Sequence, residues 1–254
     1  MQRDRNFFQI FLSTDSDHSK ALTPLIEEAS EVSRGHLHGF HYRRWDMDGL
    51  RSVIATYFGD EVLTAFDSLR PLAYKADLGR YCLLYQYGGW YADISLRIVS
   101  SALASYGSNS GLCFFRDYGE GMPSPQASCF DCQNSLIFAS AGHPALAACI
   151  RKILKNVRER YYGSSSTAPT GPSLFGSVLS GYDLTDVRQV GFFMPLTQAF
   201  SNRNLAYVSE FGEILAWHKT SWHPGRPSGG DMTSLGPRGT NNYNQLWRAR
   251  EVYV

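Results

Sequence analysis

The sequence lacks an excess of charge of either sign. Its 254 residues carry 24 Lys and Arg against 23 Asp and Glu, a formal net charge of +1. A near-neutral chain has no positive field of the kind that attracts a phosphate backbone, so we expect no nucleic-acid partner. Long hydrophobic runs are also lacking, and the apolar segment at 7–12 is too short for a signal peptide or a membrane span. We therefore expect a soluble protein, with peripheral contact to a membrane left open.

Cysteine is scarce and its number is odd. Five cysteines in a chain without a secretory signal predict reduced thiols and a cytoplasmic location. Cys129 and Cys132 form one CxxC pair, but a tetrahedral zinc site needs two further ligands that the neighbouring sequence does not supply. The crowded histidines at 36, 38 and 41 are more typical of solvated side chains than of metal ligands. Neither GxGxxG nor a Walker loop occurs, which argues against nicotinamide and ATP binding.

Length and periodicity predict one α/β domain with a sizeable core, since 43% of the residues are apolar. Strand-like segments lie at 7–12, 39–45, 90–99, 134–139, 187–194, 207–208 and 214–218. Helix-like segments lie at 19–32, 71–87 and 143–161, with short helices after Asp46 and Asp60. Strands that alternate with helices predict a mostly parallel, Rossmann-like sheet with helices on its faces. Ligands of such sheets bind at the carboxyl ends of the strands.

Two charged residues share one face of the helix predicted at 71–87. Ala73, Ala76, Asp77 and Arg80 follow helical spacing, so Asp77 and Arg80 are neighbours on a surface that is otherwise small and apolar. Taken alone, this pair is more typical of a structural ion pair than of a functional site.

The segment that follows the helix changes this interpretation. After two glycines, period-two alternation places Tyr91, Asp93 and Ser95 on one side of a strand, with Trp90, Ala92 and Ile94 on the other. An aromatic ring, a carboxylate and a hydroxyl thus lie a few residues after the Asp/Arg pair. A nucleotide-sugar donor presents hydroxyls that bind charged partners and a diphosphate that is usually neutralised by a metal with oxygen ligands. The pattern therefore favours a donor-binding site.

The residues at 75–81, KADLGRY, and at 87–95, YGGWYADIS, closely resemble the DxD sugar-binding region of a glycosyltransferase family. That family includes Och-type mannosyltransferases and bacterial capsular sugar transferases, and is more distantly similar to the glucosyltransferase domains of large clostridial toxins. Weaker matches follow in the family's order at 9–11, 42–46, 134–144, 170–172 and 218–222.

The resemblance implies a GT-A-like fold over 1–254, with a donor-binding core at about 5–100 and acceptor and closing elements at about 101–254. It implies that Asp77 and Arg80 hold the donor sugar, that Asp93 contacts ribose, sugar or metal, and that these three act in catalysis. The implied donor-binding residues are Phe11, Asp77, Arg80, Tyr91, Asp93, Ser95, Asn134, Ser221 and Trp222. Phe11 would serve as a ring platform for the nucleotide, and the C-terminal residues, with His218, would close over the diphosphate.

Ser95 departs from the family's pattern. It stands at the position of the second DxD aspartate, which is normally a direct metal ligand. A neutral hydroxyl is a weaker ligand for a hard dication than a carboxylate. A divalent Mn²⁺ or Mg²⁺ would thus depend on Asp93, Ser95 and His218 with waters, or be dispensable.

The resemblance implies a retaining hexosyltransferase of bacterial surface-glycan, polysaccharide or secondary-metabolite assembly. It would use a UDP- or GDP-sugar donor and a glycan, lipid-linked or small-molecule hydroxyl acceptor. The alternative is a non-catalytic nucleotide-sugar-binding module with a degenerate DxD site.

Overall fold

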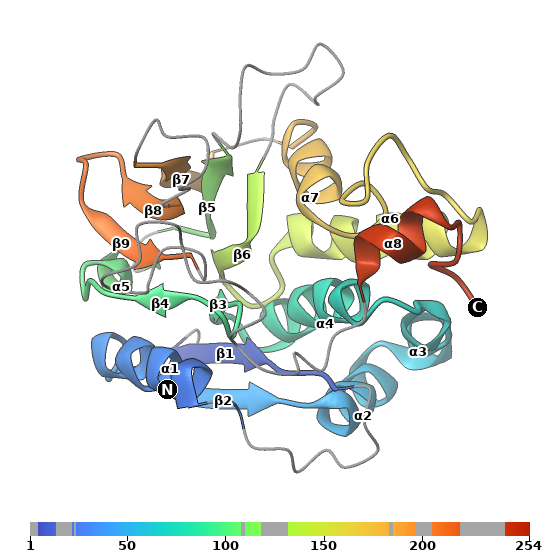
Figure 1. Ribbon diagram of the computed structural model, residues 1–254, viewed down its shortest axis with the longest axis horizontal. Helices are drawn as coiled ribbons and strands as arrows, with labels where there is room; N and C mark the ends of the chain where they lie inside the picture. The colour runs from blue at the N-terminus through green and yellow to red at the C-terminus, as the bar shows by residue number, and fades with distance from the viewer. Residues whose placement is uncertain are drawn as a thin grey trace.

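A computed structural model describes residues 5–13, 22, 24–107, 110–117, 132–182, 185–196, 205–218 and 242–254. Within these ranges one central sheet has the strand order β2-β1-β3-β6-β5-β7-β8-β9-β4 (Figure 1). Its strands are β1 (Asn6–Ile10), β2 (His41–Trp45), β3 (Gly89–Ala92), β4 (Arg97–Ile98), β5 (Leu112–Asp117), β6 (Cys132–Ala139), β7 (Val187–Pro195), β8 (Leu205–Ser209) and β9 (Ile214–Trp217).

Six of the nine described strands run in one direction, as a mostly parallel sheet predicts, whereas five of the eight neighbouring pairs are antiparallel. From the pairings, β2, β1, β3, β5, β7 and β9 run one way, and β6, β8 and β4 run the other. Direct parallel pairs join β1 to β2, β1 to β3 and β5 to β7. The carboxyl ends of β1 and β3 and the start of β6 therefore meet at one edge of the sheet.

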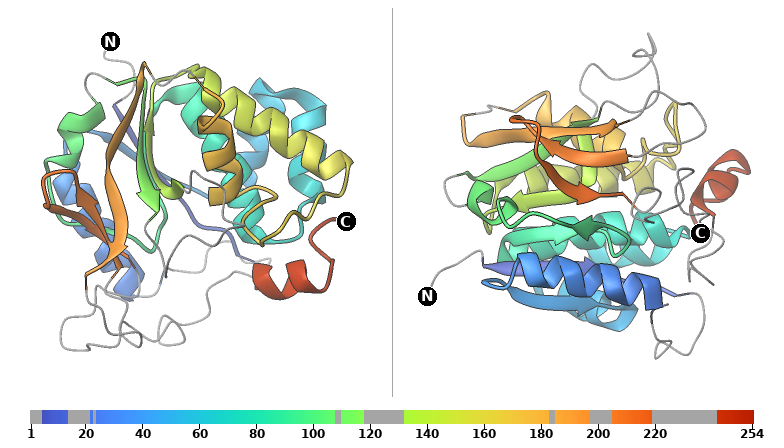
Figure 2. Two further views of the ribbon diagram at one scale, coloured as in Figure 1. Left: turned by 90° about the horizontal axis from the view of Figure 1, so that it is seen from above. Right: turned by 60° about the vertical axis from the view of Figure 1, so that its left-hand side comes forward.

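Helices cover both faces of this sheet (Figure 2). They are α1 (Pro24–His36), α2 (Met47–Tyr57), α3 (Gly59–Ser68), α4 (Leu72–Tyr87), α5 (Leu103–Tyr106), α6 (Pro144–Arg158), α7 (Pro172–Leu179) and α8 (Tyr243–Arg248). One hydrophobic cluster joins α2, α3, α4, α6 and α7 to the sheet, and a second joins the other face to α5. Tyr91 lies in the first cluster and Trp90 and Ala92 in the second, as the alternation predicts.

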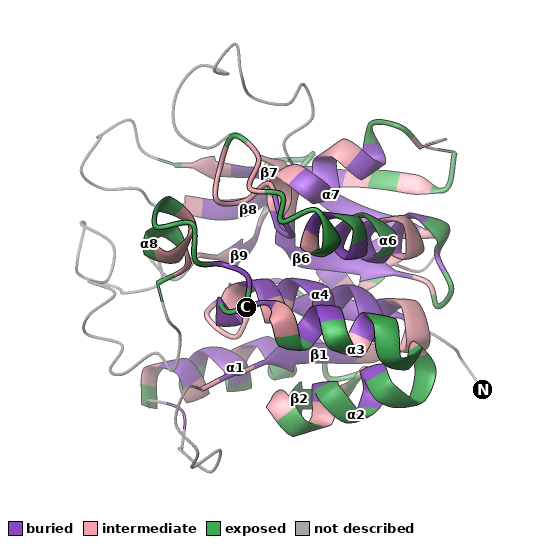
Figure 3. Ribbon diagram, turned by 90° about the vertical axis from the view of Figure 1, so that its right-hand side faces the viewer, coloured by how far each residue is buried: buried purple, intermediate pink, exposed green. Residues whose placement is uncertain are grey.

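Helix α4 lies at the centre of the molecule and is buried along most of its length (Figure 3). It packs against α2, α3, α6 and β1, which explains why polar residues on it need internal partners. Gly88 ends the helix with φ 65°. The next residue, Gly89, has φ 115°, and a Cβ there would lie 2.2 Å from the carbonyl oxygen of Asn6. Only glycine lets the chain turn this tightly from α4 into β3.

The strand predicted at 90–99 is not continuous, because a turn at 93–96 divides it into β3 and β4. Strand β3 ends at Ala92, and a turn closed by a hydrogen bond from Leu96 N to Asp93 O follows it. The chain then re-enters the sheet at its far edge, where β4 pairs with β9. Hydrogen bonding to β6 ends with the Asp93 N to Ser135 O contact, so the period-two pattern beyond Ala92 has no strand to follow.

The structure also tests the predicted helix bounds, the cysteines and the expected lack of a membrane span. Helices predicted at 71–87 and 143–161 are α4 and α6, whereas α1 begins later than the expected 19–32 and α8 was not foreseen. The four described cysteines, Cys82, Cys113, Cys132 and Cys149, are buried and free, and Cys129 lies outside the described residues. No helix in the described ranges is both long and apolar enough to cross a membrane.

Candidate functional site

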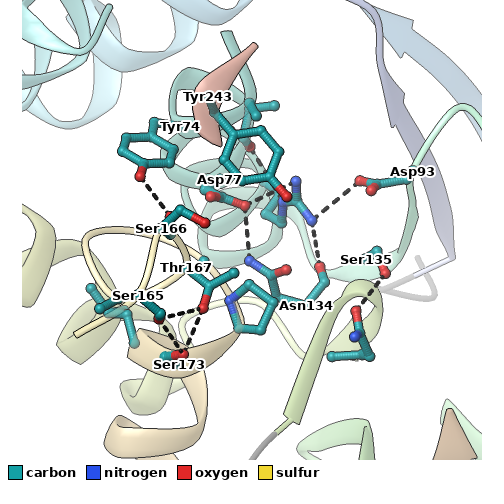
Figure 4. A pocket seen from close by; sticks show the side chains of 18 of the residues that line it. Tyr74, Asp77, Asp93, Asn134, Ser135, Ser165, Ser166, Thr167, Ser173 and Tyr243 are labelled. Atoms are coloured by element: carbon teal, nitrogen blue, oxygen red, sulfur yellow. Dashed lines mark hydrogen bonds and ion pairs between the residues drawn. The ribbon is translucent and has the colours of Figure 1, made fainter. Parts of the chain in front are cut away.

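A cavity of about 950 Å³ opens where the carboxyl ends of β1 and β3 face α4 and α8. The predicted residues that line it are Phe11, Asp77, Arg80, Tyr91, Asp93, Ser95, Asn134 and His218. Figure 4 shows Asp77 at the centre of this cavity, with Asp93 to one side and the serine-rich loop at 161–171 to the other. The structure thus brings the described predicted residues together, while Ser221 and Trp222 lie outside the described residues.

Asp77 is buried and fully engaged by neighbouring groups. Its Oδ1 contacts the Arg80 guanidinium at 3.1 Å and accepts a hydrogen bond from Asn134 Nδ2 at 2.9 Å. Its Oδ2 accepts a 2.7 Å hydrogen bond from the Thr170 hydroxyl. Burial raises the pKa of the Asp77 carboxyl, while Arg80 and the two hydrogen bonds oppose that rise. Asp77 is therefore held in one orientation at the base of the cavity.

Arg80 connects both carboxylates of the site. Its Nη2 faces Asp77, and its Nη1 lies 3.2 Å from Asp93 Oδ1 and donates a 2.6 Å hydrogen bond to the carbonyl of Asn134. The guanidinium also lies 4.5 Å from the ring centre of Tyr91. Burial disfavours the charged form, but Tyr91 and the two aspartates outweigh it and raise the Arg80 pKa above its ordinary value. Arg80 is thus a permanently charged bridge, 4% exposed.

Tyr91 and Asp93 form a second pair at the end of β3. The Tyr91 hydroxyl donates a 2.7 Å hydrogen bond to Asp93 Oδ1, which also faces Arg80. Tyr91 is 1% exposed, whereas 36% of the Asp93 side chain is exposed. Tyr91 therefore orients Asp93 from below, and Asp93 presents part of its carboxylate to the cavity.

Three supporting residues escaped the sequence analysis as members of the site. Thr170 bonds Asp77, and Tyr81 accepts a 3.0 Å hydrogen bond from the Asn134 amide. Tyr243 of α8 approaches from the far end of the chain and lines the cavity near Asp77 (Figure 4). The Thr-Gly-Pro turn at 170–172 was a usable signal for Thr170, because its Gly171 brings the backbone against Asp77. Nothing in the sequence near Tyr243 indicated a role.

Three further predicted residues, Phe11, Ser95 and His218, also line the cavity. Phe11 follows β1 and is half-buried, with its backbone N–H bonded to the Trp45 carbonyl. Ser95 lines the cavity from the turn after β3, so it reaches the site although the strand-face argument for it fails. His218 follows β9, and its ring lies 5.4 Å from that of Phe193, at the same cavity.

The described side chains do not fit a tightly held divalent cation. Hard dications take several oxygen ligands, preferably carboxylates. Within the described ranges no group of three or more His, Cys, Asp and Glu side chains is placed to bind a metal. Asp93 already faces the Arg80 guanidinium, and Ser95 adds no charge.

The fold is of the GT-A glycosyltransferase type, and a cavity lined by charged side chains lies at the carboxyl edge of its sheet. Residues 8–110 match the family model for the "Glycosyltransferase sugar-binding region containing DXD motif". This match over part of the chain agrees with the resemblance seen in the sequence.

Individual proteins are similar to this chain over limited lengths. The chain is 36% identical over 59 residues to "Uncharacterized glycosyltransferase L373" of Acanthamoeba polyphaga mimivirus, a match that covers 23% of this chain and 24% of that protein. It is similar to the structure "PaToxG Glycosyltransferase" with a TM-score of 0.52 and 14% identity, over 70% of this chain and 69% of the other, which supports the fold alone. The UDP-bound glycosyltransferase domain from the YGT toxin matches at a TM-score of 0.36 and 13% identity, over 64% and 54% of the two chains.

Proposed function

We propose that this protein is a retaining glycosyltransferase that moves a hexose from a UDP- or GDP-sugar to a hydroxyl acceptor. The carrying observation is that Arg80 links Asp77 and Asp93 in one cavity, at 3.1 Å and 3.2 Å. Buried charged groups with fixed geometry favour a ligand rich in hydroxyls, because charge-assisted hydrogen bonds are stronger than neutral ones. The roles that follow belong to this proposal.

The donor would lie along the cavity from Phe11 to Asp77. The Phe11 ring would pack on the nucleobase, and the diphosphate would lie near Ser95 and His218, which line the same cavity. Asp77 and Arg80 would hold the hexose hydroxyls. Because Asn134, Thr170 and Tyr91 hold these charges in place, little reorganisation is needed when the donor reacts.

In the transfer step, the bond between the sugar C1 and the diphosphate oxygen breaks. A bond forms between C1 and the acceptor oxygen, and the acceptor proton passes to the departing diphosphate. Front-face transfer of this kind needs no dedicated protein base. The chain's own contribution would be to position the donor and to stabilise charge on the diphosphate side with Arg80.

The rival function is a nucleotide-sugar-binding module without turnover, favoured by Ser95 in place of the family's second DxD aspartate. Thermal shifts with UDP-glucose, UDP-galactose, UDP-N-acetylglucosamine and GDP-mannose would first identify the donor. Release of the nucleoside diphosphate, with and without Mn²⁺, then separates the two functions. Turnover supports the enzyme, and binding without turnover supports the module.

A matched pair of variants controls this experiment. Asp77→Asn removes a carboxylate from the cavity, and Asp67→Asn removes one from a surface ion pair with Arg51. The proposal expects loss of turnover in the first variant alone. Equal loss in both would indicate a general effect of charge on the protein.

A further inference from the structure

The cavity extends well past the residues proposed to hold the donor. Beyond Asp77 it is bounded by the 161–171 loop, the start of α7 and Tyr243 of α8. We propose that this part is an acceptor subsite and that it takes the hydroxyl-rich face of a carbohydrate. This inference rests on the proposed transfer reaction and names the substrate class that the reaction would use.

One side of this part is a wall of hydroxyl groups, here called the hydroxyl wall: Ser165, Thr167 and Ser173. The Thr167 hydroxyl lies 2.9 Å from that of Ser165 and 2.7 Å from that of Ser173, and all three side chains are half-buried. Figure 4 shows this cluster facing the cavity below Tyr74 and Asp77. Each hydroxyl can donate or accept, so the wall can match sugar hydroxyls in either role.

Aromatic rings supply the other part of the lining. Tyr161 is 45% exposed at the cavity, and Tyr243 is half-buried with its ring centre 6.2 Å from that of Tyr74. The Tyr74 hydroxyl donates a 2.6 Å hydrogen bond to the Ser166 carbonyl, which holds the loop to α4. Tyrosine combines a flat apolar body with a polar end, and a sugar likewise combines C–H faces with hydroxyl edges. Convergent hydroxyls between aromatic rings therefore suit a saccharide.

The charge of this part argues against other classes of acceptor. Among the described residues that line this part beyond Asp77, the charged side chain is Lys152. Its Nζ donates a 3.0 Å hydrogen bond to the Ser177 hydroxyl on α7. A single rim cation does not select a polyanion. The interrupted apolar lining, broken by Ser165 and Thr167, offers no continuous surface for an acyl chain.

The position of Asp77 joins the two parts of the cavity. Arg80 connects it to Asp93 on the diphosphate side. On the other side the Thr170 hydroxyl bonds its Oδ2, and a Cβ on Gly171 would lie 3.4 Å from the same oxygen. The 161–171 loop, which carries part of the hydroxyl wall, thus lies directly beside Asp77, the carboxylate proposed to hold the donor sugar. A saccharide on the hydroxyl wall would be adjacent to that sugar.

The test uses the full chain with the donor identified by thermal shift. Methyl glycosides of glucose, galactose, mannose and N-acetylglucosamine, with maltose and cellobiose, are the acceptor probes. Ser-, Thr- and Tyr-containing peptides form a separate arm. The variants are Thr167→Val and Ser173→Ala, combined, and Tyr161→Ala. Ser180→Ala, an exposed hydroxyl just after α7, is the matched control.

We expect at least one saccharide to accelerate nucleoside diphosphate release and to become glycosylated. The combined hydroxyl variant should raise the KM for that saccharide at least about fivefold, since each neutral hydrogen bond contributes a factor of roughly 2 to 10. The KM for the donor should stay within twofold, and Ser180→Ala should behave as wild type. Melting temperatures confirm that the variants are folded.

Three results would overturn the inference. Transfer to peptides and to no saccharide would assign the wall to a protein acceptor. A donor KM that rises in parallel with the saccharide KM would place the wall in the donor subsite. Equal effects of the wall variants and Ser180→Ala would mean that the wall contacts no acceptor. If wild type binds donors without turnover, the proposed function fails first, and saccharide binding by saturation-transfer NMR would then still report on the subsite.

Discussion

Asp77→Asn is the sharpest test of the site because the substitution preserves shape and removes charge. Oδ1 faces two donor groups, from Arg80 and Asn134, whereas Oδ2 faces one hydroxyl, that of Thr170. The amide nitrogen of the new Asn should therefore take the Oδ2 position, since the Thr170 hydroxyl can turn from donor to acceptor. The fold is expected to survive.

The stability cost can be bounded from the same contacts. Breaking a buried ion pair completely costs about 3–5 kcal/mol, because one charge is left without a partner. Arg80 keeps Asp93 and the Asn134 carbonyl, so we expect a smaller cost of about 1–3 kcal/mol. Urea denaturation of wild type and variant measures this difference.

The effect on activity should be larger than the effect on stability suggests. Loss of a hydrogen bond between a charged group and a donor hydroxyl costs about 1.5–3 kcal/mol, which is roughly a 10- to 150-fold fall in kcat/KM. Mispositioning of the sugar adds to this loss, so we expect about 10²-fold, and a similar fall for Arg80→Ala. Thr170→Val keeps the charge and removes one hydrogen bond, so it should cost about tenfold or less.

The assay is nucleoside diphosphate release under kcat/KM conditions, with melting temperatures for each variant. Folded Asp77→Asn protein with kcat/KM within threefold of wild type would refute the reasoning. The Asp77–Arg80 contact would then be a structural ion pair, which is the interpretation that helical spacing alone favours. A loss in Thr170→Val equal to that in Asp77→Asn would assign the effect to loop position rather than to charge.

Three further outcomes are expected. Ser95→Asp should lower the Mn²⁺ concentration needed for half-activation, because it adds a charged oxygen ligand, and unchanged metal response and rate would show that residue 95 does not face the donor. Because burial raises the pKa of Asp77, kcat/KM should fall with decreasing pH at values above the ordinary Asp pKa of about 3.9, and this acid limb should vanish in Asp77→Asn. Gly89→Ala should destabilise the fold by about 2 kcal/mol or more, since its Cβ would meet the Asn6 carbonyl at 2.2 Å. Gly59→Ala, with φ 77° and open space around it, should cost about 1 kcal/mol.

Local chemistry explains what the sequence could predict. The Asp77/Arg80 pair follows from helical spacing, and the placing of Tyr91 opposite Trp90 follows from strand alternation. Both patterns are set by neighbouring residues, so they need no knowledge of the sheet. Pro71 before α4 and Gly88 after it likewise allowed the ends of this helix to be predicted from the sequence.

Long-range pairing explains what the sequence could not predict. The position of Ser95 was predicted by extending the strand beyond Ala92. Strand β3 ends at Ala92, where its pairing with β6 ends, and residues 90–95 alone do not determine that pairing. Helix α8 is only six residues long, and the core that its Tyr243, Leu246 and Trp247 pack against is formed by distant segments, among them α4. Thr170 gained its role from a fold that brings residues 93 positions apart into contact.

That last contact has a consequence for how the protein is made. Asp77, Arg80 and Asp93 all lie within residues 8–110, the segment that matches the family model, whereas Asn134 and Thr170 lie beyond it. At a synthesis rate of roughly 5–20 residues per second, Thr170 is added about 5–19 s after Asp77. Over that interval Asp77 lacks the Thr170 hydroxyl, although its ion-pair partner Arg80 is already present. A fragment ending near residue 110 would therefore contain the residues that match the family model and still lack the Asn134 and Thr170 groups that hold Asp77, so it would not form the complete cavity.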